Sequence, residues 1–219
     1  MNNPIFITGA PRSGKTMIAG ILDICGVFLG TTDSMLENIA IRDRLIKPYL
    51  MYHGGHSSGL KQIPETCKLT YRIDWVDKVE GILEEQGYDG SQKWMFKSAK
   101  VALTWPVWNR AFPNAKYIIV RRRTGDIIQS CLKTGYMKAY DNKEGWKTMV
   151  HQYENKFVEM ISEGLNCKVI WPHRMVHGDY GQIYELLEWL GLPWKTEILN
   201  HIDPKFWKTR KKEKSWQDQ

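Results

Sequence analysis

The chain has 219 residues, of which 42% are hydrophobic and 25% charged, so it is long enough for one α/β domain with a buried core. No apolar stretch approaches the length that crosses a bilayer, and we expect no membrane partner. The four cysteines show no paired spacing, which argues against a disulfide framework and a metal site. Because the chain enters a strand almost at once, a signal peptide has no room and a cytoplasmic location is expected.

The first chemical signature is a glycine-bounded loop between an apolar strand and an apolar helix. Residues 5–7 predict the strand, 9–16 have the pattern GxxxxGKT, and 17–22 carry the apolar spacing of a helix. Glycine lets the backbone wrap closely around an anion, and the helix start directs amide groups and the positive end of its dipole toward it. The sequence therefore predicts a phosphate-binding loop, whose contacts would come from Ala10, Pro11, Arg12, Ser13, Gly14, Lys15 and Thr16.

Further along the chain, apolar periodicity predicts strands that alternate with helices. Further strands are expected at 94–97, 116–120 and 167–171. Helices are expected at 35–50, ending near Pro48, at 74–86, from Gly125, at 146–161, and from Asp179, where Gln182 would complete a capping box. The alternation predicts the α/β class, with a mainly parallel sheet flanked by helices in one P-loop-type domain over residues 1–204. Residues 205–219 are interpreted as a basic tail.

The second signature is the segment 120–130, VRRRTGDIIQS, which predicts a strand, a run of arginines, a turn and a helix. Arg122 before the turn and Ser130 on the helix could hold one more phosphate. Asp126 suits the helix start, where a negative charge balances the helix dipole. Taken alone, the segment is equally consistent with an arginine-rich loop on a basic surface.

A feature of P-loop kinases is missing from the strong strands. Such enzymes hold magnesium with an aspartate at the end of an apolar strand, whereas 118–120 runs into arginines and 169–171 into Pro172. A phosphate loop without an evident metal carboxylate suggests transfer of a less charged group than a phosphoryl group, with side-chain cations in place of a metal. We therefore expect no metal at the site.

The two signatures together resemble the sulfotransferases that use 3′-phosphoadenosine 5′-phosphosulfate (PAPS). Residues 11–16, PRSGKT, match the family loop PKSGTT, with Lys15 in place of its first threonine. Arg122, Asp126 and Ser130 have the spacing of the family motif VRNPRDxxxS. Weaker matches and departures also occur. The matches are 94–98, 112–119 and 186–194, and the departures are Arg123 and Thr124 for the family's Asn-Pro and 210–216 for its RKGxxGDW segment.

The resemblance implies a P-loop fold and PAPS as the cofactor that supplies a sulfuryl group. It implies that the loop amides from Ala10 to Thr16, together with Arg122 and Ser130, hold the nucleotide. Arg12, Lys15 and Lys97 would neutralise charge during the transfer. The acceptor would be a hydroxyl or an amine of a small molecule or a glycan.

The transfer also needs a base that accepts the acceptor's proton. Related enzymes use a glutamate or a histidine, and we place the base on Glu37, with His53 second and His56 in the same loop. Residues 51–64 predict an exposed, mobile loop that either contacts substrate or is a plain surface linker. Glu37 is equally consistent with a charge on a helix surface.

Two other functions remain compatible with the sequence. Lys15 within GKT is typical of a P-loop kinase for a nucleotide or small metabolite, which would use ATP and magnesium. The net charge of +7 also fits a module that binds a nucleotide or a polyanion without catalysis, although nucleic acid is the less favoured partner. The sequence does not indicate an oligomeric state.

Overall fold

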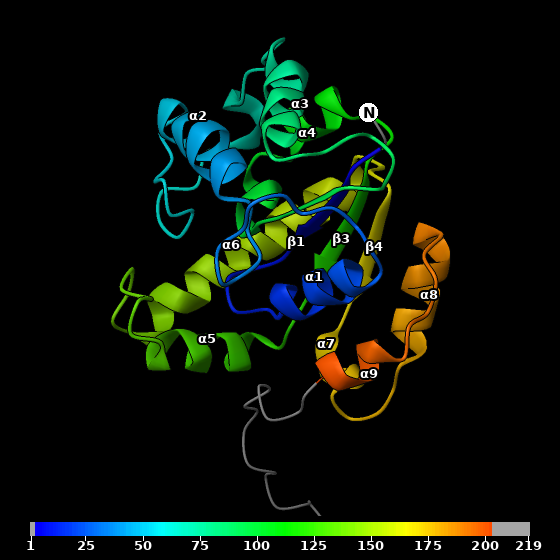
Figure 1. The fold of residues 1–219 in the computed structure, drawn as a ribbon. Helices are drawn as coiled ribbons and strands as arrows, with labels where there is room; N and C mark the ends of the chain where they lie inside the picture. The colour runs from blue at the N-terminus through cyan, green and yellow to red at the C-terminus, as the bar shows by residue number, and fades with distance from the viewer. Residues whose placement is uncertain (1–2, 203–219) are drawn as a thin grey trace, which may run out of the picture.

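The fold is built on one parallel sheet, and the computed structural model describes residues 3–202. The basic tail predicted at 205–219 lies outside the described residues. Four strands pair in the order β2-β1-β3-β4, all of them parallel, as Figure 1 shows. Their bounds are Ile5–Thr8 for β1, Met95–Lys97 for β2, Lys116–Val120 for β3 and Cys167–Ile170 for β4. These strands confirm the predicted α/β class and mainly parallel sheet.

The helices connect the strands and cover both faces of the sheet. The α-helices are α1 Lys15–Ile24, α2 Lys47–Tyr52, α3 Trp75–Glu85, α4 Trp105–Ala111, α5 Thr124–Lys133, α6 Lys143–Ser162, α7 Pro172–Met175, α8 Gly181–Leu190 and α9 Glu197–His201. A π-helix, η1, spans Ile41–Ile46, and two 3-10 helices are η2 Thr66–Lys68 and η3 Ala99–Leu103. Among the described residues, none of these helices has the length and apolarity that a bilayer crossing requires.

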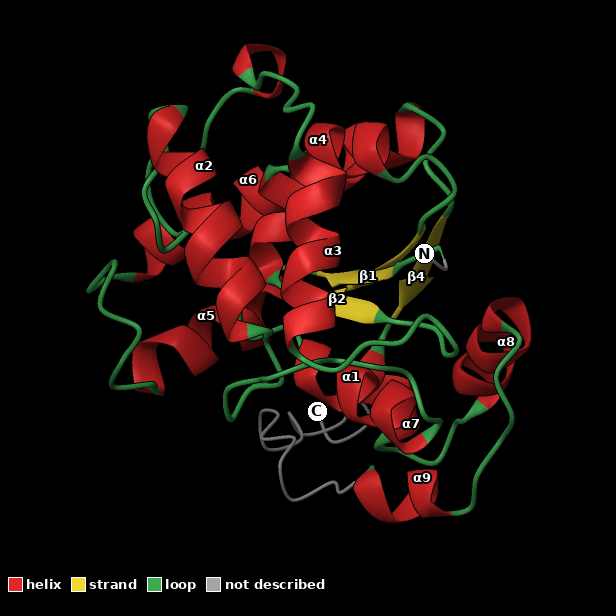
Figure 2. Cartoon of the chain, turned by 45° about the horizontal axis from the view of Figure 1, so that its top comes forward, coloured by secondary structure: helices red, strands yellow, loops and turns green. Residues whose placement is uncertain are grey.

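Two cores lie on opposite faces of the sheet because successive strand residues point to opposite sides. Phe6 and Tyr117 pack with α3, α4 and α6, whereas Ile5, Ile7 and Ile118 pack with α1, α8 and α9. Figure 2 shows these two groups of helices on either side of the strands. The sheet is buried on both faces, and its carboxyl edge is left for a ligand.

The helix predicted at 35–50 is wrong at both ends. Residues 33–37 form a tight turn, and the helical segment runs without a break through Pro48 to Tyr52. Pro48 is the second residue of α2, which follows directly on η1, so the change from π-helical to α-helical winding falls next to the residue that lacks an amide hydrogen. Glu37 therefore precedes the helix and is not a charge on its surface.

The capping box predicted for α8 is also wrong. The helix begins at Gly181, whose amide donates to Asp179 Oδ1 at 3.1 Å. Gln182 does not bond back to the helix start, because its Oε1 accepts from the amide of Trp171 at 2.9 Å. The glutamine instead ties α8 to the end of β4. The helix ends at Gly191, as predicted, with a left-handed φ of 64°.

Candidate functional site

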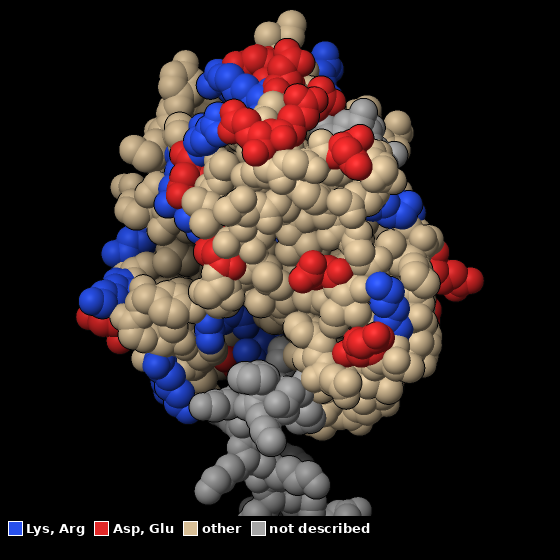
Figure 3. Space-filling model, in the orientation of Figure 1, with Lys and Arg blue, Asp and Glu red and all other residues tan. Residues whose placement is uncertain are grey.

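The candidate site is a cavity of about 720 Å³ at the carboxyl ends of β1, β2 and β3. Figure 3 shows Lys and Arg side chains around a hollow in the lower part of the view. The predicted loop, the end of β2 and the segment after β3 all contribute to its wall. Of the residues predicted for the site, those that line the cavity are Pro11, Arg12, Gly14, Lys15, Thr16, Glu37, Lys97 and Arg122.

The loop after β1 has the tight geometry of an anion cradle. A Cβ on Gly9 would lie 2.3 Å from Val120 O, so only glycine lets the loop pass this close to β3. Gly14 caps α1 with a φ of 101°, and Arg12 has a φ of 67°, which side chains rarely adopt. The buried Ser13 hydroxyl makes no hydrogen bond within residues 3–202. The unpaired amides at the start of α1 lie at the cavity, together with the positive end of the helix dipole. An anion is stabilised at this end of the helix.

Lys15 supports the loop from within. Its Nζ donates to Gly9 O at 3.0 Å and to Ala10 O at 2.8 Å, so Ala10 contributes a carbonyl that holds the lysine. Burial lowers the pKa of Lys15 well below its usual value, and the charge of Lys97 lowers it further. A bound anion would offset this desolvation cost, because it places an opposite charge beside the ammonium group.

Arg12 joins the two predicted signatures. Its Nε donates to Ser130 Oγ at 3.0 Å, although the two residues are 118 positions apart. Its NH1 donates to Tyr136 Oη at 2.6 Å. Arg122 NH1 in turn donates to Arg12 O at 3.1 Å. The loop, Arg122 and Ser130 therefore lie side by side. Tyr136 was not predicted as a site residue from the sequence.

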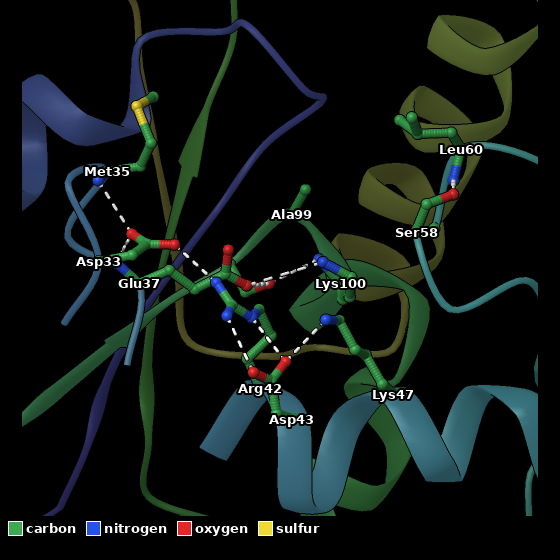
Figure 4. Close-up of polar contacts among 12 residues, drawn as sticks. Asp33, Met35, Glu37, Arg42, Asp43, Lys47, Ser58, Leu60, Ala99 and Lys100 are labelled. Atoms are coloured by element: carbon green, nitrogen blue, oxygen red, sulfur yellow. Dashed lines mark hydrogen bonds and ion pairs between the residues drawn. The ribbon is translucent and has the colours of Figure 1, made fainter. Parts of the chain in front are cut away.

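Glu37 extends toward the lysines at the end of β2. Its Oε1 accepts from Ser98 Oγ at 2.6 Å and lies 3.7 Å from Lys100 Nζ, as Figure 4 shows for Lys100. Burial lowers the pKa of Lys97 and of Lys100, and the negative charge of Glu37 opposes the shift in both. Lys100 was not predicted as a site residue from the sequence. The available signal was its place three residues after Lys97, just past the end of the predicted strand.

The two loop histidines do not line the cavity. His53 Nε2 lies 3.2 Å from Thr70 Oγ1, and its ring packs on Tyr49. His56 Nδ1 lies 2.7 Å from the hydroxyl of Ser58. The structure therefore brings Glu37, and neither histidine, to the cations of the loop.

The loop at 51–64 nevertheless forms part of the wall through Ser58 and Leu60. It is anchored to the body of the protein, because the buried hydroxyl of Tyr153 donates to Gly59 O at 2.8 Å and the partly buried hydroxyl of Tyr140 donates to Leu60 O at 3.1 Å. Of the two interpretations left open by the sequence, the one in which the loop reaches a substrate site fits this placement.

The family is shown by a match over most of the chain. The model described as the sulfotransferase family matches residues 4–196. The chain belongs to the sulfotransferase family. It is 23% identical over 221 residues to a Caenorhabditis briggsae protein named "Putative protein-tyrosine sulfotransferase". The matched region covers 90% of this chain and 68% of that protein. The resemblance inferred from the two signatures is confirmed.

Solved sulfotransferase structures share the fold. The sulfotransferase domain from the olefin synthase of Synechococcus PCC 7002 superposes with a TM-score of 0.63 at 16% identity, over 91% of this chain and 77% of that one. The sulfotransferase domain from the curacin biosynthetic pathway has a TM-score of 0.59 at 19% identity, over 92% of this chain and 78% of that one. At these identities the likeness concerns the architecture alone.

Proposed function

We propose that this sulfotransferase transfers a sulfuryl group from PAPS to a hydroxyl or amine acceptor without a metal ion. The observation that carries the proposal is the charge of the cavity. Among the lining residues of the described chain, Glu37 is the single carboxylate, and five cationic side chains line the same cavity, namely Arg12, Lys15, Lys97, Lys100 and Arg122. Such a site suits a multiply charged anion beside one basic carboxylate.

The loop fits the phosphosulfate end of PAPS. The close approach at Gly9, the helix start at Gly14 and the buried Ser13 hydroxyl provide a cradle of donors. Arg122 and Ser130 would hold the second phosphate, because both are bonded to Arg12 and so lie beside the loop. When bound, PAPS supplies the sulfuryl group.

The protein's own contribution to the transfer is proton removal and charge stabilisation. Glu37 would take the proton of the acceptor, since its carboxylate lies within the cavity beside Lys100. Arg12, Lys15 and Lys97 would stabilise the negative charge that develops on the leaving oxygen. His53 is the weaker candidate for the base, because its ring packs on Tyr49 away from the lining residues.

The decisive experiment is calorimetry with adenosine 3′,5′-bisphosphate (PAP), the nucleotide product, in buffer that contains EDTA. We expect binding without metal, together with a rise in melting temperature. ATP with magnesium serves as the competing ligand. Binding of ATP and magnesium with no binding of PAP would overturn the proposal in favour of a kinase.

Acceptors can then be screened with labelled PAPS. The proposal covers small molecules and glycans with a hydroxyl or amine. The name of the Caenorhabditis briggsae relative adds a peptide tyrosine to the panel. A Glu37→Gln variant, which keeps the shape of the side chain and removes its basicity, should bind PAP and lose transfer to every acceptor.

A further inference from the structure

The segment that carries Glu37 is a tight turn organised by one carboxylate. Asp33 Oδ1 accepts from the amide of Met35 at 2.9 Å and from that of Glu37 at 3.1 Å. The amide of Asp33 donates in return to Glu37 O at 3.1 Å. Leu36 within the turn has a φ of 58°, which L side chains rarely adopt. The turn therefore depends on the bonds of Asp33 to keep this strained conformation.

Arg42 holds the second oxygen of that carboxylate. Its NH1 lies 2.6 Å from Asp33 Oδ2, while its Nε and NH2 bind Asp43 at 2.9 and 3.0 Å. Lys47 fixes Asp43 from one turn further on, at 2.7 Å. Figure 4 shows these side chains as one continuous row that ends beside Glu37. Arg42 lies in the π-helix η1, a type of winding that is frequent at functional sites.

The turn is also attached to the phosphate-binding loop. Thr16 Oγ1 donates to Met35 O at 3.3 Å. The carboxylate of Glu37 is held at its far end by Ser98 at 2.6 Å and by Lys100 at 3.7 Å. The backbone of Glu37 is thus placed by Asp33, and its head group by the segment after β2.

Asp33 remains ionised around neutral pH. Burial by itself would raise the pKa of Asp33, whereas hydrogen bonds from the backbone amides of Glu37 and Met35 lower it. The charges of Lys97 and Arg42 act in the same direction as these bonds, and the pKa lies below its usual value. The carboxylate thus retains the charge with which it binds Arg42.

We propose that Arg42 is a positioning residue, which acts through Asp33 to hold the carboxylate of Glu37 at the place of proton removal. The inference rests on the proposed role of Glu37 as the base. Arg42 itself does not line the cavity, and although its charge also acts through space on Glu37 and Lys100, its hydrogen bonds reach Glu37 through Asp33 and the turn. Without it, one oxygen of Asp33 loses a charged partner, and the strained turn gains freedom to move. A displacement of about 1 Å at a catalytic group lowers a rate by as much as roughly 100-fold.

Arg42→Gln tests the proposal against a matched control on the same helical segment. The control is Arg44→Gln, which removes the same charge. Arg44 pairs with Glu85 on the exposed surface at 2.6 Å. Both variants are crystallised with PAP, and the affinity for PAP is measured by calorimetry. We expect PAP affinity within about twofold of the unaltered protein in both. We expect the carboxylate of Glu37 to be displaced by about 1 Å or more in Arg42→Gln alone.

Turnover gives the second readout, with 2-naphthol as the probe acceptor and release of PAP from PAPS as the signal. Arg42→Gln should lower the rate by about 10- to 100-fold, Arg42→Lys should restore part of it, and Arg44→Gln should leave it unchanged. Added to Glu37→Gln, the Arg42→Gln change should cause no further loss, because both act through one carboxylate. A merely structural role would instead give additive losses.

Asp33→Asn covers the case in which Arg42→Gln does not fold. The amide oxygen of asparagine still accepts from the backbone of the turn, whereas its NH₂ group cannot accept from Arg42. The inference is overturned if Glu37 keeps its position in the PAP complex of either folded variant, or if the losses are additive. A lack of PAP binding by the unaltered protein would instead contradict the proposed donor, which separates the two failures.

Discussion

Replacing Arg122 by alanine should weaken the binding of PAP while the fold is retained. Arg122 follows β3 directly, lines the cavity, and donates from NH1 to Arg12 O at 3.1 Å. Burial lowers the pKa of Arg122, and Asp126 opposes the shift. Because the guanidinium is held in a partly buried position, it can reach a phosphate with little loss of side-chain freedom.

The magnitude follows from the type of contact. A hydrogen bond to a charged group contributes about 1.5–3 kcal/mol, which corresponds to roughly a 10- to 150-fold increase in Kd. Ser130→Ala removes a neutral hydroxyl, whose loss costs about 0.5–1.5 kcal/mol, or roughly a 2- to 13-fold increase. Loss of Ser130 also leaves Arg12 Nε without its 3.0 Å partner, so part of this cost reflects a reoriented Arg12.

The assay is calorimetry with PAP in EDTA at two ionic strengths. Arg123→Ala is the matched control, because it removes the same charge from the next residue, whose side chain is exposed. A long-range effect of charge would weaken both variants and fade at high salt. A direct contact would weaken Arg122→Ala alone and persist. Equal losses for the two arginines, or unchanged affinity for Arg122→Ala and Ser130→Ala, would refute the assignment of the second phosphate.

Three further predictions concern stability. Gly9→Ala places a Cβ 2.3 Å from a backbone carbonyl of β3 and should lower the free energy of unfolding in urea by about 1–3 kcal/mol. Gly125→Ala, where a Cβ meets nothing within 4 Å, should not lower it. Equal losses for the two variants would contradict the close approach at Gly9. Tyr153→Phe leaves the carbonyl of Gly59 without its 2.8 Å bond and should cost about 1–3 kcal/mol, and an unchanged urea midpoint would show that the loop is held by other contacts. Burial lowers the pKa of His53 below 6.5, so the unfolded state binds the imidazole proton more readily than the folded state. The contribution of the neutral imidazole to stability is therefore present above pH 6.5 and lost as the pH falls through the folded-state pKa. An NMR titration of the imidazole checks this pKa. An imidazole that titrates at or above 6.5 would contradict the burial of this ring.

Local patterns were sufficient to predict the sheet and the phosphate-binding loop. Apolar runs at 5–7 and 116–120 predict strands, and all four expected strands are present. The glycines of 9–16 predict a loop whose close approach to β3 excludes any side chain at Gly9. The strands and the turn into α1 depend on neighbours in the chain, so residue spacing is enough to reveal them, whereas the partner that Gly9 approaches, Val120, lies far along the chain.

The start of the helix after Glu37 and the bond made by Gln182 were predicted wrongly for the opposite reason. Asp33 holds residues 33–37 in a turn with Arg42, and Gln182 bonds to Trp171 across the chain. In each case a side chain had a partner outside its own element, and that partner outweighed the local preference on which the prediction relied.

The composition of the cavity depends on contacts between distant parts of the chain. Glu37 meets Ser98 across 61 positions and Arg12 meets Ser130 across 118, and no local spacing encodes either distance. His53 was the second candidate for the base, yet its ring packs on Tyr49. Helix packing against the sheet decides which polar side chains reach the carboxyl edge, because the orientation of a helix about its own axis sets which of its faces is buried and which is exposed.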